Sequence, residues 1–218
     1  MRKMITVKIN GEERQYPQGA TYEDVANDYQ QEYENLIALA ARDGKIRELF
    51  KKLTRDCEVT FFTLKDDVGN KTYVRSATML FLKAVFDVYG REAAQSCRVE
   101  FAIGNGSYIS PRGQIAATED NAAKIRDRMR ELVEAKTPFL KRSYSLDNAM
   151  ELFHKEGMKD KEKLFRYRRG SFLNIYEMDG YYDYYYGYML PNAGYVKWFD
   201  VIAYDEGFML LLPDKQDP

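Results

Sequence analysis

Few side chains in this sequence could carry out acid–base, nucleophilic or metal chemistry. His154 is the only histidine, so a Ser-His-Asp triad could be built only around it, and a metal site with several histidines is excluded. Cys57 and Cys97 are far apart and form no CxxC pair, which indicates neither a zinc site nor a disulfide framework. His154 stands beside Lys155 and Glu156 on the polar side of a predicted helix, which favours a solvated surface residue over a general base.

Glycine-rich motifs that bind phosphate are not found either. The pattern GxxxxGK[ST] occurs nowhere in the sequence, which excludes a Walker-type nucleotide cradle in this chain. Residues 104–107 (GNGS) contain two glycines but lack the strand-to-helix context of a dinucleotide-binding fingerprint. We interpret them as a turn.

The segment from Gly180 to Gly194 (GYYDYYYGYMLPNAG) is dominated by tyrosine. Tyrosine favours the half-buried surface of a sheet and tolerates burial when its hydroxyl finds a partner. The segment therefore predicts an aromatic strand whose rings build a core. A platform on which a ligand stacks is the alternative.

Residues 159–170 (KDKEKLFRYRRG) form the one basic stretch with aromatic residues among its charges. Basic and aromatic side chains together could contact the phosphates and bases of a nucleic acid, although a solvated edge is the favoured interpretation. The candidate RNA-contacting residues are Lys163, Arg166, Arg168 and Arg169.

The composition is that of an ordinary globular protein. The 218 residues are 45% hydrophobic and 31% charged, with a net charge of −1, so any contact with nucleic acid needs a local basic patch. The start of the chain is too short and polar for a signal peptide, and no apolar run approaches the roughly 20 residues that span a bilayer. We expect a cytoplasmic protein with no membrane partner.

The first 63 residues predict a small sheet with one helix. Residues 4–9 alternate as a strand does, Asn10-Gly11 is a strong hairpin signal, and a second strand runs through Tyr16. Thr21 is a predicted N-cap of a short helix, and residues 36–41 and 57–63 predict two further strands. This order is typical of a ubiquitin-like fold, and we place the first domain at residues 1–63.

The remaining chain predicts a second, α+β domain at residues 64–213, followed by a polar tail at 214–218. A polar joint at 66–70 precedes a long helix from Thr72 to Tyr89, which Gly90 ends. A hairpin follows around residues 104–106, and Thr118 and Ser145 are predicted caps of two further helices. Residues 139–144 predict a strand, and strands and turns fill residues 171–212.

Four anchors occur in the order found in a known family. They are Val74-Arg75-Ser76, Asn105-Gly106, Thr118-Glu119-Asp120 and the segment 180–194. On these anchors, residues 1–63 resemble a TGS domain, the β-grasp module of threonyl-tRNA synthetases and some GTPases. Residues 64–213 resemble the adjacent editing domain of threonyl-tRNA synthetase, also called its second additional domain.

The resemblance implies an editing pocket whose reactive residues are replaced. In the editing family the long helix carries HSxxHLL and the late segment reads DxCRGPHxPxxG. Arg75 and Met79 stand here at the two helical histidine positions, Tyr185 at the cysteine position and Met189 at the last histidine position. All four residues that could hold a metal are replaced.

Other parts of the pattern persist. The resemblance implies that Lys161 and Asp183 are the pocket lysine and aspartate, and that Gly187, Pro191 and Gly194 keep the backbone frame. Arginine cannot act as a base near neutral pH, methionine is a weak ligand, and tyrosine of ordinary pKa is a poor nucleophile. Ester hydrolysis by a general base or a metal hydroxide is therefore not supported, and we expect no catalytic residue, metal or cofactor in this chain.

The same arrangement resembles the N-terminal half of bacterial uridine-kinase-like nucleoside kinases. That resemblance implies a C-terminal kinase domain in a longer parent protein, with ATP and Mg²⁺ as cofactors only there. We expect a non-catalytic binding or regulatory module that binds RNA, tRNA or a nucleotide, or that mediates assembly into an oligomer. The alternatives are an aminoacyl-tRNA editing hydrolase and a self-standing RNA-binding protein.

Overall fold

The computed structural model describes residues 3–167 and 170–215, which form an α+β fold with three sheets. They divide into two compact units. The first contains the chain up to Ala77, Tyr188–Pro191 and the residues from Leu212 on, and the second contains Thr78–Gly187 and Asn192–Leu211. The domain boundary that the sequence places after residue 63 stays a prediction.

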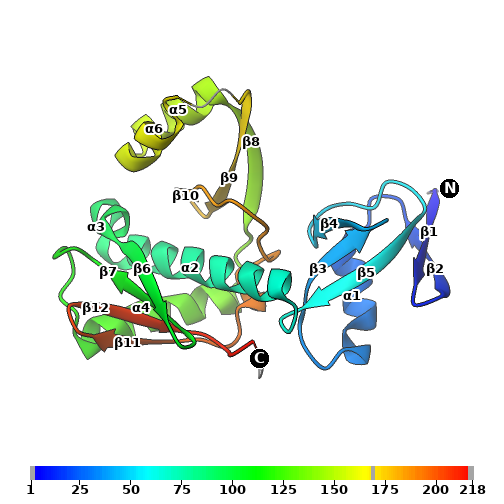
Figure 1. The fold of residues 1–218 in the computed structure, drawn as a ribbon, viewed down its shortest axis with the longest axis horizontal. Helices are drawn as coiled ribbons and strands as arrows, with labels where there is room; N and C mark the ends of the chain where they lie inside the picture. Colours follow the sequence, from blue (N-terminus) through cyan, green and yellow to red (C-terminus); the bar gives the residue numbers. More distant parts are fainter. Residues whose placement is uncertain (1–2, 168–169, 216–218) are drawn as a thin grey trace. The chain divides into compact units, whose positions relative to one another are not determined.

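A five-stranded sheet with a helix forms most of the first unit (Figure 1). Its elements are β1 (Met4–Ile9), β2 (Glu12–Pro17), α1 (Tyr22–Tyr29), the 3₁₀ turn η1 (Gln30–Glu32), β3 (Ile37–Arg42), β4 (Lys45–Glu48) and β5 (Cys57–Thr63). The strand order is β2-β1-β5-β3-β4, with β1 and β5 parallel and every other pair antiparallel. The side chain of Thr21 caps α1 in a capping box, as predicted.

One strand of this sheet was not predicted. β4 pairs with β3 across a turn in which Asp43 and Gly44 have φ values of 50° and 75°. Two successive positive φ values are those of the hairpin turn whose twist matches paired strands. The sequence did not indicate this strand, because Lys45–Glu48 is short and lacks alternation.

The long helix begins earlier than predicted. α2 spans Asp67–Tyr89, so most of the segment interpreted as a polar joint is its first turn. The Asp66 carboxylate accepts hydrogen bonds from the Thr63 backbone and hydroxyl, and its carbonyl accepts from the amide of Asn70. The polar residues that resemble a linker therefore start a helix, with the Asp66 carbonyl accepting a backbone hydrogen bond from the first turn. The second half of α2, from Thr78, belongs to the second unit.

The second unit contains two antiparallel sheets. Its elements after α2 are α3 (Arg91–Ser96), β6 (Arg98–Ile103), β7 (Gly106–Ser110), α4 (Glu119–Glu134), β8 (Leu140–Ser145), α5 (Leu146–Lys155), α6 (Lys159–Phe165), β9 (Phe172–Met178), β10 (Tyr181–Asp183), η2 (Ala193–Tyr195), β11 (Asp200–Tyr204) and β12 (Gly207–Leu211). The hairpin at residues 104–106 and the side-chain caps at Thr118 and Ser145 are confirmed.

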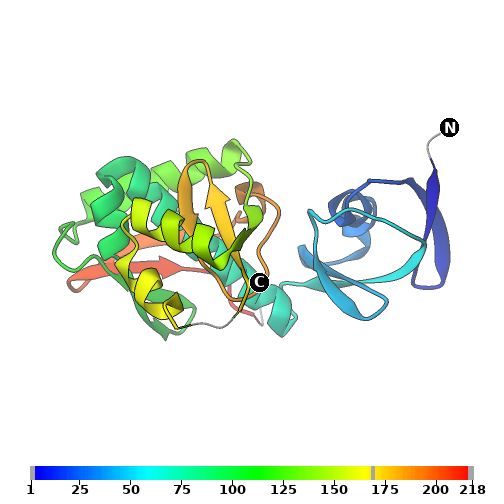
Figure 2. The same cartoon turned by 90° about the horizontal axis from the view of Figure 1, so that it is seen from above.

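Helices cover one face of each sheet. The four-stranded sheet β11-β12-β7-β6 packs on α2, where Phe81 meets Phe208, and on α4, whose Arg126 donates to the carbonyl of Val201. The three-stranded sheet β10-β9-β8 packs on α5 and α6 through an apolar cluster that includes Phe153, Phe165 and Ile175. Figure 2 shows these two helices along that sheet. No helix among the described residues is long and apolar enough to cross a bilayer.

Candidate functional site

A cavity of about 230 Å³ lies in the second unit, between the wall formed by α2, α3 and the start of β6 and the wall formed by α6 and β10. Aromatic, cationic and anionic side chains all line it. The first wall includes Arg91, Cys97 and Arg98, and the second includes Asp160, Lys161 and the run from Tyr181 to Tyr185. Three residues predicted for the degenerate editing pocket, Lys161, Asp183 and Tyr185, are thus brought together.

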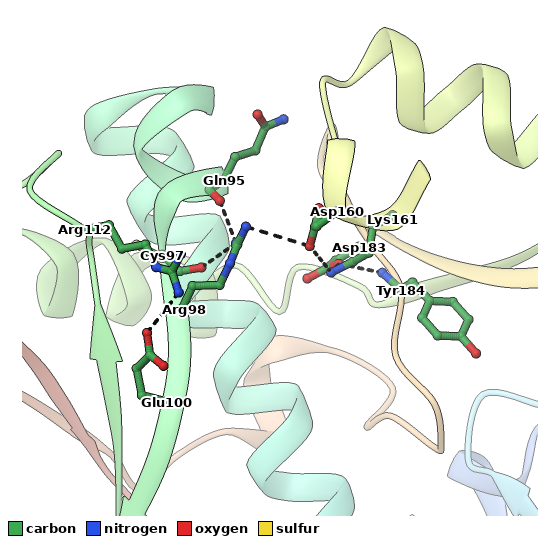
Figure 3. Close-up of polar contacts among 9 residues, drawn as sticks. All are labelled: Gln95, Cys97, Arg98, Glu100, Arg112, Asp160, Lys161, Asp183 and Tyr184. Atoms are coloured by element: carbon green, nitrogen blue, oxygen red, sulfur yellow. Dashed lines mark hydrogen bonds and ion pairs between the residues drawn. The ribbon is translucent and has the colours of Figure 1, made fainter. Parts of the chain in front are cut away.

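The charged groups of the second wall are paired with one another (Figure 3). Lys161 Nζ lies 3.3 Å from Asp183 Oδ1 and 3.2 Å from Asp160 Oδ2. The Tyr184 amide donates to Asp183 Oδ1 at 2.7 Å. From the first wall, Arg98 Nη2 lies 4.0 Å from Asp160 Oδ2 while Nη1 donates to the carbonyls of Gln95 and Cys97. The cavity therefore contains an ion-pair network that runs from the buried Asp183 through Lys161 to the exposed Asp160.

Burial and pairing act in opposite directions on this network. Burial disfavours the charged form of Lys161, but the carboxylates of Asp183 and Asp160 outweigh it, so the pKa of Lys161 is raised above its ordinary value. Burial raises the pKa of Asp183, and Lys161 with the Tyr184 amide offsets only part of that effect. Lys161 is therefore a fixed cation at neutral pH and cannot serve as a general base.

Two tyrosines of the cavity, Tyr181 and Tyr185, remain protonated at neutral pH. Burial, followed by the nearby charge of Asp183, raises the pKa of Tyr181 and of Tyr185 well above 10. The Tyr185 hydroxyl is buried near the Asp183 carboxylate, but it does not reach full hydrogen-bond geometry with that carboxylate or with any other described atom. Leaving such a group unpaired costs about 1–3 kcal/mol, so this hydroxyl is available to a polar group of a ligand. Burial likewise raises the pKa of the Cys97 thiol to about 12, which keeps it un-ionised at neutral pH.

The tyrosine-rich segment is not the continuous strand that the sequence predicted. Only Tyr181–Asp183 forms a strand, β10, and its pairing with β9 ends at Tyr176. Beyond that point Tyr176 donates its hydroxyl to the Gly187 carbonyl at 2.9 Å, which holds the chain in a loop. The run therefore supplies cavity wall at Tyr184 and Tyr185, whereas Tyr186 is 89% exposed.

The glycines of the predicted backbone frame have local reasons to be glycine. Gly187 has φ of 141°, a backbone conformation that side chains with a Cβ rarely adopt. A Cβ on Gly194 would lie 2.9 Å from Asn192 Oδ1 and 2.9 Å from Lys136 Cγ. The backbone conformation at Gly187 and the close contacts at Gly194 therefore exclude larger residues at these two positions.

Arg75 and Met189 belong to the first unit. Arg75 Nη1 donates to the Tyr188 carbonyl at 2.8 Å. The neighbouring Ser76 hydroxyl accepts the Leu190 amide at 2.9 Å and lies 3.9 Å from the sulfur of Met189. Arg75, which stands at a predicted histidine position, thus holds the backbone of Tyr188 by a hydrogen bond. Met79, in the second unit, is completely buried in α2 and does not line the cavity.

The candidate RNA-contacting residues are placed only in part. Lys163 in α6 and Arg166 just after it are exposed, whereas Arg168 and Arg169 lie outside the described residues. His154 is solvent-exposed as predicted, with Nδ1 3.4 Å from Glu162. Among residues 3–167 and 170–215, no three His, Cys, Asp or Glu side chains gather as a metal site.

Sequence reasoning missed several cavity residues. Arg91 is the first residue of α3, a helix of six residues that was not predicted, and Arg98 follows that helix. Asp160 was interpreted as part of a solvated stretch. Gly90 before α3, with φ of 86°, was a signal for a helix end but not for a new helix. The pairing of Arg98 with Asp160 is a tertiary contact that local pattern could not show.

The chain is similar over most of its length to curated threonine–tRNA ligases. The enzyme of Thermotoga neapolitana is 27% identical over 208 residues, which cover 92% of this chain and 31% of that protein. The enzyme of Porphyromonas gingivalis is 25% identical over 194 residues, which cover 86% of this chain and 29% of that protein. That of Carboxydothermus hydrogenoformans is 24% identical over 201 residues, covering 91% and 31%.

These similarities confirm the resemblance to threonyl-tRNA synthetases, and the chain spans about a third of the length of the relatives it matches. No family model matches the chain. The assignment of a TGS domain and the link to a nucleoside kinase stay predictions.

Proposed function

We propose that this chain is a non-catalytic binding module, related to the editing region of threonyl-tRNA synthetases, whose cavity holds a ligand without hydrolysing it. The observation that supports this most is the cavity around Lys161 and Asp183. Its charged groups are paired with one another, while the buried Tyr185 hydroxyl lies near Asp183 without full hydrogen-bond geometry to any described atom. Such a site can orient a polar ligand but offers little that could activate water.

The ionisation of the cavity residues argues against the hydrolase alternative. A nucleophile must be deprotonated or have an adjacent base, and the pKa of Cys97 is about 12 while that of Tyr185 is raised well above 10. Lys161 stays protonated between two carboxylates. The two buried carboxylates of the site are both held in ion pairs, Asp183 with Lys161 and Glu156 with Arg91.

We infer a β-grasp module of the TGS type for residues 1–63. The support is the mixed sheet β2-β1-β5-β3-β4. In this sheet β1 and β5, the first and last strands along the chain, pair in parallel at Val7 and Cys57, and α1 packs against β3. A helix crossing between strands that end up adjacent and parallel is the geometry predicted for a ubiquitin-like fold. An editing-like domain accounts for the rest of the chain to residue 213.

We propose the aminoacylated end of a tRNA, or a nucleotide, as the ligand. The tyrosines of the cavity supply aromatic faces for a base, and Lys161 supplies a fixed positive charge. On the outside of α6, Lys163 and Arg166 are exposed cations that could contact phosphates. Lys161 and Lys163 thus lie on one short helix with different surroundings, which provides a matched pair of variants.

The test measures tRNA binding and deacylation separately. We expect the chain to bind threonine tRNA with an affinity that falls as salt rises, and Lys161→Met to weaken binding of the charged 3′ end without affecting uncharged tRNA. Lys163→Met should weaken both forms equally, because a phosphate contact does not distinguish them. Mischarged threonine tRNA should not be deacylated.

Two results would decide against the proposal. Turnover of mischarged tRNA that Lys161→Met or Asp183→Asn abolishes would establish the hydrolase. Failure to bind tRNA or a nucleotide at low salt would remove the proposed ligands. The separate proposal of a nucleoside kinase parent rests on sequence resemblance alone, and it fails if the reading frame after Pro218 encodes no GK[ST]-type P-loop. The cytoplasmic location stays a prediction.

A further inference from the structure

Strand β6 is an edge strand whose apolar side chains are exposed. In the described part of the chain it pairs with β7 on one side only. Val99, Phe101 and Ile103 are 50%, 51% and 47% exposed, and Ala102 between them is exposed as well. Proteins usually protect such edges with charges, proline or very short strands, because free backbone groups on an apolar edge recruit another strand. In β6 the charge of Glu100 and a bulge lie before residues 101–103, which contain neither a charge nor a proline.

A bulge gives both faces of this edge an apolar character. Val99 pairs with Ile109, whereas Phe101 pairs with Tyr108, so one extra residue, Glu100, lies between them. Val99 therefore faces the side of the sheet that carries Ile109, and Phe101 faces the opposite side with Tyr108. The extra Glu100 is drawn toward Arg112, 3.4 Å away, and so does not charge the centre of the strand (Figure 3).

An aromatic row on the face of Phe101 leads to this edge. Phe101 stacks on Tyr108 with ring centroids 4.9 Å apart, and Tyr108 meets the edge of Tyr204 at 6.1 Å. Gly207 makes room for the row, since a Cβ there would lie 2.8 Å from the Tyr108 hydroxyl. The row ends at Phe101, whose ring is half exposed because none of the described strands continues the sheet beyond it.

We propose that β6 is a homodimer interface, in which β6 of a second copy pairs antiparallel with it about a two-fold axis at Ala102. This register places Phe101 opposite Ile103 of the second copy, and both side chains lie on the face of the aromatic row. Glu100 falls opposite Gly104, so no like charges oppose each other. The two four-stranded sheets then form one sheet of eight strands.

Other registers fit less well. Centring the axis between Phe101 and Ala102 pairs side chains that point to opposite faces, because strand residues alternate. Centring it on Phe101 places Ile103 opposite Val99, which the bulge has turned to the other face, and Glu100 opposite Ala102. A second copy also suits the charge of the chain, because a net charge of −1 gives little repulsion between copies.

Sedimentation equilibrium over a concentration series tests the dimer. We expect a monomer–dimer equilibrium in the unmodified chain and a dissociation constant at least about 100-fold higher for Phe101→Lys, since an isologous interface contains the change twice. Leu164→Lys, at a site 63% exposed in α6, should leave the equilibrium unchanged. Circular dichroism confirms that both variants fold.

Disulfide trapping tests the register. Ala102→Cys should form a covalent dimer on mild oxidation, because residues opposite each other on a two-fold axis are within disulfide reach. Asn105→Cys should not, because its own counterpart would lie several residues along the partner strand. A chain that stays monomeric, a dimer that survives Phe101→Lys, or trapping at Asn105→Cys instead of Ala102→Cys would each overturn the proposal. None of these results bears on ligand binding in the cavity.

Discussion

Two regions of the molecule contain residues at the predicted editing-pocket positions, and they use them differently. In the first unit, Arg75 stands where the resemblance predicts a histidine, and its guanidinium donates to the Tyr188 carbonyl. In the second unit, Lys161 and Asp183 match the predicted pattern and line a cavity that also exposes the unpaired hydroxyl of Tyr185. A replaced position such as Arg75 can therefore serve the fold, while the retained Lys161 and Asp183, with the replaced Tyr185 beside them, keep the capacity to bind a ligand.

The two regions differ in whether their buried polar groups have hydrogen-bond partners. Around Arg75, the amides of Met189 and Leu190 each have a side-chain acceptor, in Glu48 and Ser76. Around Lys161 the charges are balanced, but a buried hydroxyl is left over. A ligand gains little from backbone amides that are already paired, whereas a buried hydroxyl without a full hydrogen bond can still accept a ligand partner.

We expect the largest loss of stability from a change at Lys83, which holds the cavity wall formed by β10. Lys83 is 2% exposed, lies 2.6 Å from Asp87 Oδ1, and donates to the Asp179 carbonyl at 2.8 Å. Asp179 begins the turn that leads into β10, so Lys83→Met should loosen that wall and destabilise the protein by about 3 kcal/mol. The value is the low end for a buried pair, because Arg128 still pairs with Asp87.

Urea unfolding measures this change, with Lys71→Met, at an exposed position of the same helix, as the control. Lys83→Met should also weaken ligand binding in the cavity more than its effect on stability alone explains. A loss of stability no larger than that of the control would mean that Lys83 does not hold the turn at Asp179 in place.

The second prediction concerns the fully satisfied region. Ser76 is completely buried, donates to the Thr72 carbonyl and accepts the Leu190 amide. Ser76→Ala leaves that amide without its partner, and we expect a loss of about 1–3 kcal/mol in the free energy of unfolding. Ser143→Ala, at an exposed site in β8, should change it by less than about 0.5 kcal/mol. Equal stability of the two variants would show that the Leu190 amide finds another acceptor.

Local signals predicted the fold better than the site. Thr21, Thr118 and Ser145 were identified as caps because a cap depends on residues within one turn. The end of the tyrosine strand at Asp183 could not be predicted, because it depends on where pairing with β9 stops. Equally, the replaced residue Arg75 revealed nothing of the carbonyl that it binds, since Tyr188 lies far along the sequence.

The third prediction contrasts two tyrosines whose rings meet edge to face at 6.4 Å. Tyr176 donates its hydroxyl to the Gly187 carbonyl, whereas the Tyr185 hydroxyl has no partner among the described residues. Tyr176→Phe should cost about 1 kcal/mol, and Tyr185→Phe should be neutral or stabilising, because it removes a buried group that is unpaired. Thermal or urea unfolding measures both. The same cost for both changes would mean that the Tyr185 hydroxyl is already satisfied in solution.

The smallest effect separates two neighbouring carboxylates by the sign of their pH dependence. Burial raises the pKa of Asp183 above its ordinary 3.8. For Asp160, burial acts in the same direction, but Lys161 and Arg98 outweigh it and lower the pKa. A raised folded-state pKa contributes stability that is present below the unfolded pKa and lost as pH rises through the folded pKa, and a lowered one does the reverse.

The free energy of unfolding, followed from neutral pH into acid for each variant, should therefore diverge. As pH falls toward 3.8, the unmodified protein should gain stability relative to Asp183→Asn, because its folded state takes up the proton first. Below 3.8 it should lose stability relative to Asp160→Asn, because the folded state resists that proton. If both differences moved in the same direction, burial would not dominate at Asp183. Water would then reach Asp183 more readily than its ion pair with Lys161 indicates. The contrast between the cavity and the region around Arg75, where the backbone amides are paired, would be weaker.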